Sequence, residues 1–200
     1  MKHLSPKNDL IANTIKVIAS EGLDKTTTKS IVRGTGINEA YIYRFFSDKE
    51  ELLARTFDML DDELVDVVSK NSEIMLEKNL EFEVRARLYF RAVWQFLLGN
   101  REKCVAYIRY FYSPYFKKHS DEAHKERFAE YTKYISSAFK EEANVWMILN
   151  HILNVMLDFA VKVFDGAVGD NEDTEEHVFR LVYVSVKQYF NKDRDEEKIV

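Results

Sequence analysis

The chain has 200 residues, of which 46% are hydrophobic and 32% are charged, a balance typical of folded globular proteins and not of disordered ones. The only cysteine, Cys104, excludes an internal disulfide and a four-cysteine zinc site, and we expect it to be a buried hydrophobe. The formal net charge is -5, but residues 1–50 carry eight Lys and Arg against six Asp and Glu. This N-terminal segment is therefore the part of the chain best suited to contact a polyanion.

Few residues interrupt helices, because the chain contains only six Gly and two Pro. This composition favours an all-α fold with about nine helices over a fold of many short strands. The N-terminus lacks the apolar stretch of a secretory signal, and no apolar run of about 18 residues predicts a membrane-spanning helix. We therefore expect a cytoplasmic protein with no membrane partner.

The first helix is predicted from a start signal and a stop signal. Ser5 is a good N-cap, Pro6 suits the first helical position, and Gly22 ends the apolar stripe that follows. A hydroxyl within Thr26-Thr27-Thr28 is expected to cap a second helix that ends at Gly36.

The third and fourth helices also begin at recognisable caps. Asn38 is a natural N-cap for a short helix that runs to about Phe45. Ser47 and Glu50 have the spacing of a capping box, which predicts the start of a long fourth helix. Two short helices joined by a glycine-containing turn are typical of a helix-turn-helix, although an ordinary three-helix subdomain has the same spacing.

Particular residues between Ile11 and Leu53 carry a more specific signal than this spacing. They are Gly22, Thr26-Thr27, Ile31, Gly36-Ile37-Asn38, Ile42-Tyr43, Phe46 and Lys49-Glu50-Glu51-Leu52. The segment resembles the TetR family signature: a threonine pair, a Gly-Val-Ser turn, a Leu-Tyr-X-His-Phe recognition helix and a Lys-Glu start to the next helix. The departures are modest, with Ala40 in place of the common Gly and Phe45 in place of the frequent His or Tyr.

The resemblance implies a helix-turn-helix DNA-binding domain at 1–50 and a helical-bundle domain for ligand binding and dimerisation at 51–200. It implies that the third helix enters the major groove of double-stranded DNA. Six residues resemble the phosphate contacts of the family or lie beside such contacts: Thr27, Thr28, Lys29, Arg33, Tyr43 and Lys49. The face toward the base edges is Asn38, Glu39, Ala40, Tyr41 and Arg44.

Beyond Leu53 the apolar pattern predicts helices at about 48–70, 81–98, 101–112, 120–140, 143–166 and 173–191. The last two carry the longest apolar stripes. By resemblance to the family, the helices at about 143–166 and 173–191 form a four-helix bundle with their counterparts in a homodimer. The alternative is that these stripes form only an intramolecular core.

Aromatic residues cluster in the middle of the chain. Such a set can line an apolar ligand cavity with phenol hydroxyls that orient a guest, although aromatics at helical spacing also form ordinary core. The candidate ligand-binding residues are Trp94, Tyr107, Tyr110, Phe111, Tyr131, Met147 and His151. Glu83 and Glu130 are acidic neighbours, so we expect a small apolar or aromatic/cationic effector.

No motif of the sequence predicts catalysis. There is no Gly-rich phosphate loop, nucleophile elbow or Cys/His dyad, and His119 and His124 lack metal-ligand spacing and are expected at the surface. We therefore expect no enzyme activity, no metal and no cofactor.

The predicted function is a ligand-responsive regulator that binds an inverted-repeat operator as a dimer, most simply as a repressor released by its effector. Three alternatives remain at this point. They are an activator of the same fold, a helical small-molecule-binding protein without DNA binding, and an all-helical enzyme that uses the aromatic cavity.

Overall fold

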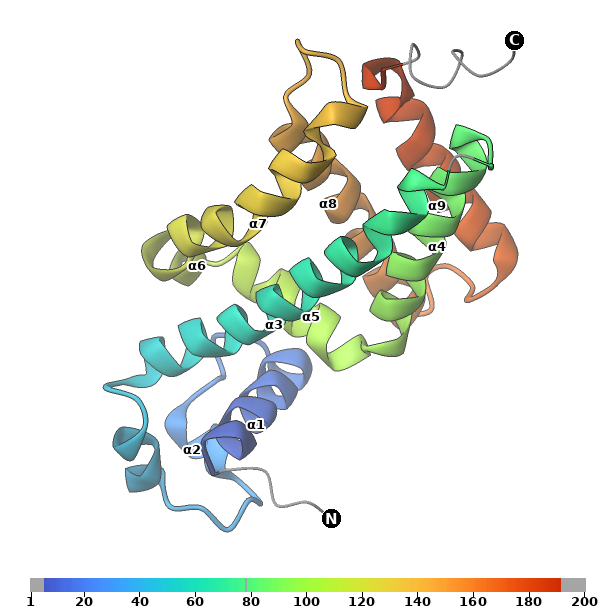
Figure 1. Ribbon diagram of the computed structural model, residues 1–200. Helices are drawn as coiled ribbons and strands as arrows, with labels where there is room; N and C mark the ends of the chain where they lie inside the picture. Colours follow the sequence, from blue (N-terminus) through green and yellow to red (C-terminus); the bar gives the residue numbers. More distant parts are fainter. Residues whose placement is uncertain (1–5, 78, 192–200) are drawn as a thin grey trace, which may run out of the picture. The chain divides into compact units, whose positions relative to one another are not determined.

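The computed structural model describes residues 6–77 and 79–191 and shows a chain of helices (Figure 1). In these residues the one extended pairing is an isolated antiparallel bridge between Phe139 and Phe190. The prediction of an all-α fold is confirmed. In chain order the helices are α1 (Pro6–Glu21), α2 (Thr28–Val32), η1 (Glu39–Arg44), α3 (Lys49–Asn71), η2 (Ser72–Leu76), α4 (Phe82–Gly99), α5 (Arg101–Phe111), α6 (Pro114–His119), α7 (Asp121–Ile135), η3 (Ser136–Ala138), α8 (Val145–Phe164), α9 (Glu172–Val186) and η4 (Lys187–Tyr189), the η elements being 3-10 helices.

The predicted signals place the first three helices, with one correction. α1 begins at Pro6 and is followed by Gly22 at a φ of +86°, whereas the predicted cap Ser5 lies outside the described residues. Thr27 caps α2 by accepting a hydrogen bond from the backbone of Ser30 at 3.0 Å. The second helix ends at Val32 and not at Gly36, because Arg33 leaves helical geometry with a ψ of 123°.

The third helix is tighter than predicted, and the fourth has a different cap. Asn38 caps η1 as expected, accepting from the backbone of Ala40 at 3.0 Å. The predicted Ser47–Glu50 capping box is wrong by one residue. The Glu51 backbone donates to Asp48 Oδ1 at 2.8 Å, and Glu51 Oε2 accepts from the Ser47 backbone at 2.6 Å. Asp48 is therefore the N-cap of α3. Glu50 takes no part in this cap and instead contacts Lys118 and His119 of α6.

Two predicted helices in the second half are too long, and one helix was not predicted. Pro114 occupies the first turn of α6, where its missing N–H is tolerated, although Ser113-Pro114 was interpreted as a break. The helix expected at 120–140 ends at Ile135, and the helix expected to reach residue 191 ends at Val186. Short 3-10 turns follow both.

The chain forms two compact units, each built from two separate segments. The first unit combines residues up to Leu64 with Asn100–Glu126, and the second combines Val65–Gly99 with the residues from Arg127 onward. Because the boundaries fall inside α3 and α7, each of these helices contributes residues to both units.

The core of the first unit is formed where α1 packs against α2 and α5. At the centre of its aromatic part, the ring of Phe57 lies 5.0 Å from that of Tyr107 and 4.9 Å from that of Tyr110. Arg109 of α5 donates to the carbonyls of Ile18 and Ala19 at 2.7 and 2.9 Å. The guanidinium therefore satisfies the Ala19 carbonyl at the C-terminal end of α1 and adds a second donor to the Ile18 carbonyl, which also accepts from the Gly22 backbone at 3.1 Å.

A polar network is buried in the same unit. Asp61 is completely buried, and it accepts a hydrogen bond from the hydroxyl of Tyr107 at 3.0 Å. Its carboxylate oxygens also lie 2.9 and 3.0 Å from Nδ1 of His124. The expectation that His124 is a surface residue is therefore wrong, because its ring is buried against the carboxylate. The network joins α3, α5 and the first part of α7.

Cys104 is buried on α5 of the first unit. Burial raises the pKa of its thiol to about 12. The expectation of a buried hydrophobe is confirmed, because a thiol with this pKa holds almost no reactive thiolate at neutral pH.

The core of the second unit is formed by α4, α8 and α9, which pack against one another (Figure 1). Ion pairs connect α4 to α9: Arg91 Nε lies 2.5 Å from Glu175 Oε1, and Arg180 Nη1 lies 2.9 Å from Glu83 Oε1. A cluster of Phe139, Ile148 and Val186 closes one part of the core.

α8 is long and apolar enough to pass a membrane-span test by composition, with a hydropathy of 1.5, and no other described helix does so. We interpret α8 as a core helix of a globular unit, because it packs against α4 and α9. An ion pair between Asp158 and Lys162, at 2.6 Å, also lies on it.

Candidate functional site

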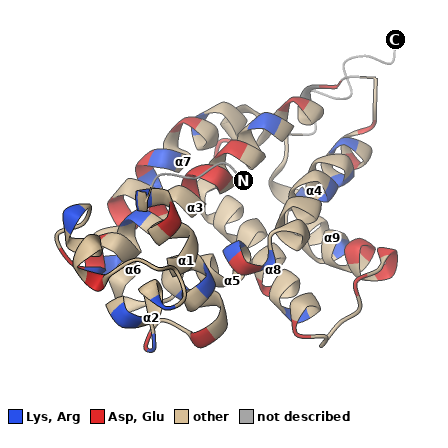
Figure 2. Cartoon of the chain, turned by 90° about the horizontal axis from the view of Figure 1, so that it is seen from below, with Lys and Arg blue, Asp and Glu red and all other residues tan. Residues whose placement is uncertain are grey.

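The first candidate site is the surface formed by α2, η1 and the start of α3. We call it the DNA-contact surface after its predicted role. None of the predicted contact residues on it is buried: Thr27, Lys29, Arg33, Asn38, Ala40, Tyr43 and Arg44 are exposed, and Thr28, Glu39, Tyr41 and Lys49 are partly exposed. Figure 2 shows basic residues on and around α2, interspersed with acidic ones. The surface is accessible to a polyanion but is not uniformly positive.

The short helix η1 turns its polar and aromatic face outward because two apolar residues fix the other face. Ile42 is completely buried and Phe46 is 2% exposed, whereas Tyr43 is 58% exposed. The Arg44 guanidinium lies 4.8 Å from the centroid of the Tyr41 ring. Tyr41 therefore restricts the directions in which Arg44 can reach, which reduces the entropy lost when the guanidinium binds a ligand.

Two of the predicted contact residues bind each other. Thr28 Oγ1 donates to Glu39 Oε2 at 2.7 Å, which ties the start of α2 to the start of η1. Arg33 makes a similar local contact, since its Nη1 lies 3.0 Å from Glu21 Oε1. These partners give the residues a structural role that the sequence pattern did not indicate.

The start of α3 is held by α6. Lys49 Nζ lies 5.8 Å from the centroid of the Tyr115 ring. Glu50 accepts from Lys118 Nζ and contacts His119 Nε2, each at 2.7 Å. The Lys118 bond, followed by the His119 contact, lowers the pKa of the Glu50 carboxyl. This contact could not be predicted, because α6 itself is absent from the helices expected from the apolar pattern.

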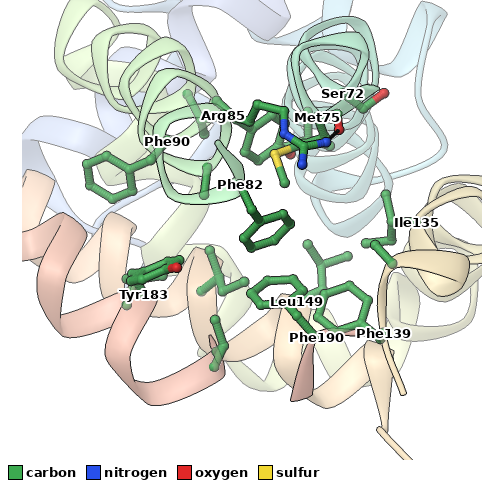
Figure 3. A pocket seen from close by; sticks show the side chains of 18 of the residues that line it. Ser72, Met75, Phe82, Arg85, Phe90, Ile135, Phe139, Leu149, Tyr183 and Phe190 are labelled. Carbon is green, nitrogen blue, oxygen red and sulfur yellow. Dashed lines mark hydrogen bonds between the residues drawn. The ribbon is translucent and has the colours of Figure 1, made fainter. Parts of the chain in front are cut away.

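The second candidate site is a cavity of about 690 Å³ inside the second unit (Figure 3). This volume lies within the range of about 300–1,000 Å³ that is common for small-molecule sites. Its walls are mostly aromatic and aliphatic. The polar residues among them are Ser72, Arg85, Tyr89, Tyr131, Tyr134, Ser137, Tyr183 and Asn191.

The structure brings one of the predicted ligand residues, Tyr131, to this cavity. Trp94 is 1% exposed in the second unit but is not part of the cavity wall. Tyr107, Tyr110 and Phe111 belong to the core of the first unit, and Met147 and His151 lie on the exposed face of α8.

The acidic residues that suggested a cationic guest also lie outside the cavity wall. Glu83 pairs with Arg87 and Arg180, at 3.4 and 2.9 Å. Glu130 is exposed.

Two cavity residues on α4, Tyr89 and Arg85, are not among the predicted ligand-binding residues. Tyr89 places its hydroxyl 2.5 Å from that of Tyr131, and burial raises the pKa of both phenols, that of Tyr131 to about 12. Arg85 is 7% exposed and donates to the backbone carbonyl of Met75 at 2.8 Å. Helical spacing did not indicate Arg85, because at 3.6 residues per turn it lies roughly 110° around the helix from the stripe of Phe90, Val93 and Leu97.

The comparisons with known proteins agree with this arrangement. Residues 10–56 match the model of the family described as bacterial regulatory proteins, tetR family. A comparison with curated proteins found no match.

Among solved structures, the fold is similar to a putative tetR family transcription regulator from Shewanella sp. PV-4, with a TM-score of 0.71, 17% identity, and 90% of this chain and 96% of that chain covered. A TetR family transcription regulator from Marinobacter aquaeolei VT8 gives a TM-score of 0.69 at 14% identity, with 90% and 94% covered. A putative TetR-family regulator from Syntrophomonas wolfei gives 0.67 at 16% identity, also with 90% and 94% covered.

At these identities the structures establish the fold, whereas the family model establishes the relationship of the segment that carries α1, α2 and η1. The segment with α1, α2 and η1 is therefore a helix-turn-helix of the tetR family type, and nearly the whole chain shares the fold of structures described as TetR-family regulators, which supports a DNA-binding regulator.

Proposed function

We propose that the chain is a ligand-responsive, dimeric transcriptional regulator, in its simplest form a cytoplasmic repressor with no catalytic activity. The observation that carries the proposal is the presence, in one chain, of an exposed η1 with Tyr43 and Arg44 and of a cavity of about 690 Å³. The DNA-binding part is residues 1–50, and residues 51–200 bind the ligand and the second subunit.

On the DNA-contact surface, we assign phosphate contacts to the hydroxyls and cations of α2, η1 and the start of α3. These residues are Thr27, Thr28, Lys29, Arg33, Tyr43 and Lys49. Asn38, Glu39, Ala40, Tyr41 and Arg44 face the base edges. Of these, Arg44 is the strongest candidate, because a guanidinium binds guanine O6 and N7 in a bidentate manner.

Exposed apolar residues on α8 and α9 support dimerisation. Met147 is 66% exposed, Leu181 55% and Val184 54%, while only 33% of the apolar stretch of α8 is buried within the chain. Exposed apolar side chains that gather on neighbouring helices are typical of an interaction surface. We propose that α8 and α9 cover it with the same helices of a second copy, which also gives His151 a place near the interface.

This dimer leads to a test at Leu181. We expect Leu181→Glu to convert the protein from dimer to monomer in sedimentation velocity, because it places a charge in an apolar interface. Leu88→Glu is the matched control, since Leu88 is 40% exposed on α4 and lies outside the proposed interface. A Leu181→Glu protein that sediments as the wild type does would contradict the assignment of α9 to the interface.

The ligand signal is proposed to travel along α3. Val68 of α3 lines the cavity, and so does Ser72, the first residue after the end of α3. The same helix begins at Lys49, which belongs to the DNA-contact surface. A ligand that repositions this helix changes the position of η1 in the dimer. A coupling free energy of about 1–3 kcal/mol is typical and suffices for a switch of about 5–150-fold.

Selection of bound duplexes from a random DNA library tests the proposed function. We expect one inverted repeat to be enriched, since two copies on a two-fold axis present two recognition helices. Recovery of no preferred sequence by folded, dimeric protein would count against it. A reporter placed behind the selected repeat then separates a repressor from an activator by the sign of its response.

A further inference from the structure

The cavity of the second unit has a definite charge character. Arg85 is the only charged side chain among the described residues that line it, and no Asp or Glu lies in the wall. A guanidinium remains protonated at every physiological pH. The described wall therefore carries one positive and no negative side chain, and it offers no counter-charge to a cationic guest of the kind expected from Glu83 and Glu130.

Arg85 is held in place before any ligand arrives. It donates to the carbonyl of Met75 at 2.8 Å, and its guanidinium carbon lies 5.5 Å from the centroid of the Phe82 ring. Figure 3 shows Arg85, Met75 and Ser72 on one side of the cavity, across from Leu149, Phe139 and Phe190. Arg85 therefore lies across the cavity from these apolar side chains, and the guanidinium need not be reorganised on binding.

The remaining polar groups are uncharged. The hydroxyls of Tyr89 and Tyr131 lie 2.5 Å apart, and burial raises the pKa of both phenols, so that both stay protonated at neutral pH. Protonated phenols orient a ligand by hydrogen bonds without adding a charge. The opposite wall, with Leu149, Phe139 and Phe190, suits an aliphatic or aromatic body.

We propose that the cavity binds an apolar monocarboxylate, with its carboxylate on Arg85 and its apolar body against the wall formed by Leu149, Phe139 and Phe190. The planar guanidinium matches a carboxylate in a bidentate geometry, and a charge-assisted hydrogen bond is stronger where water is excluded. This inference rests on the proposed ligand-responsive function and specifies the chemical class of its ligand.

Isothermal titration of the full-length wild-type protein with paired probes tests the class. Dodecanoate is compared with 1-dodecanol and dodecylammonium below their aggregation thresholds, and 2-naphthoate is compared with 2-naphthalenemethanol. We expect at least one carboxylate to bind at least about tenfold more tightly than its neutral counterpart, because hydrogen bonds to charged groups contribute this much. An equal or stronger affinity for the alcohol or the ammonium, or no binding by any probe, overturns the proposal.

A variant pair tests the role of Arg85 itself. Arg85→Met is expected to abolish the preference for the carboxylate while leaving the affinity for the alcohol within a few fold. Arg91→Met removes a cation from the same helix but outside the cavity wall, and it is expected to keep the preference. Retention of the full preference by Arg85→Met overturns the assignment.

Should Arg85→Met fail to fold by circular dichroism, the comparison of head groups on the wild-type protein decides alone. These titrations contain no DNA. A protein that binds carboxylates but remains bound to its operator DNA would therefore contradict the proposed ligand response. The same result would not contradict the proposed class of ligand.

Discussion

Arg44→Ala is expected to weaken binding to the selected inverted repeat by about 2–6 kcal/mol. A bidentate arginine–guanine contact contributes about 1–3 kcal/mol, and a dimer loses it in both half-sites. The side chain is exposed and lies over the ring of Tyr41, so its removal leaves the buried face of η1, with Ile42 and Phe46, intact. Fluorescence anisotropy with a labelled duplex at one fixed salt concentration measures the change.

The same variant is expected to relax the sequence preference at one position of each half-site, which a removed phosphate contact would not do. Arg55→Ala is the control, because Arg55 is exposed on α3 and pairs with Asp58 on that helix at 3.2 Å. We expect it to bind as the wild type does, within about 0.5 kcal/mol. Unchanged affinity and unchanged preference in Arg44→Ala would show that η1 does not read bases through this residue.

Asp61→Ala is expected to lower the free energy of unfolding by about 3–5 kcal/mol. The carboxylate is completely buried, and its loss removes one partner from the Tyr107 hydroxyl and one from the His124 ring. Buried polar groups that lose a hydrogen-bond partner retain their full desolvation cost. Urea titration followed by circular dichroism, at one protein concentration because of the proposed dimer, gives the value.

Asp66→Ala is the matched control on the same helix. Its carboxylate is 67% exposed and pairs with the exposed Lys70 at 3.0 Å, so we expect a change below about 1 kcal/mol. His124→Ala should also destabilise, and the double variant should lose less than the sum of the two single changes, because the residues share one contact. A loss below about 1 kcal/mol for Asp61→Ala would contradict the buried network.

The helices that form the DNA-contact surface could be predicted well because their signals are local. Caps, glycine stops and apolar spacing depend on neighbours a few residues away, and Thr27, Asn38 and Gly22 perform the expected roles in the structure. The cap of α3 was misplaced because Ser47 and Asp48 are adjacent and both suit the position. Only the observed hydrogen bond from the Glu51 backbone to Asp48 distinguishes them.

The cavity was harder to predict because periodicity identifies a buried face but not the core to which it belongs. Tyr107 and Tyr110 lie on a buried face of α5, yet that face packs around Phe57 in the first unit. Each unit is assembled from two distant segments, so the assignment of α5 to the first unit depends on tertiary contacts. Arg85 was overlooked because buried positions were sought among apolar residues, whereas a charged side chain occupies one of them.

The proposed regulator binds one inverted repeat with two copies of the chain, through charged and hydrogen-bonded contacts. The most direct test of this binding measures the mass of the complex and the affinity for the selected repeat and for a single half-site, at about 50 and about 200 mM salt. We predict two chains on the repeat, much weaker binding to the half-site, and a loss of about a thousandfold or more as salt rises. One chain on the repeat with half-site affinity, or an affinity that does not depend on salt, would contradict this mode of binding.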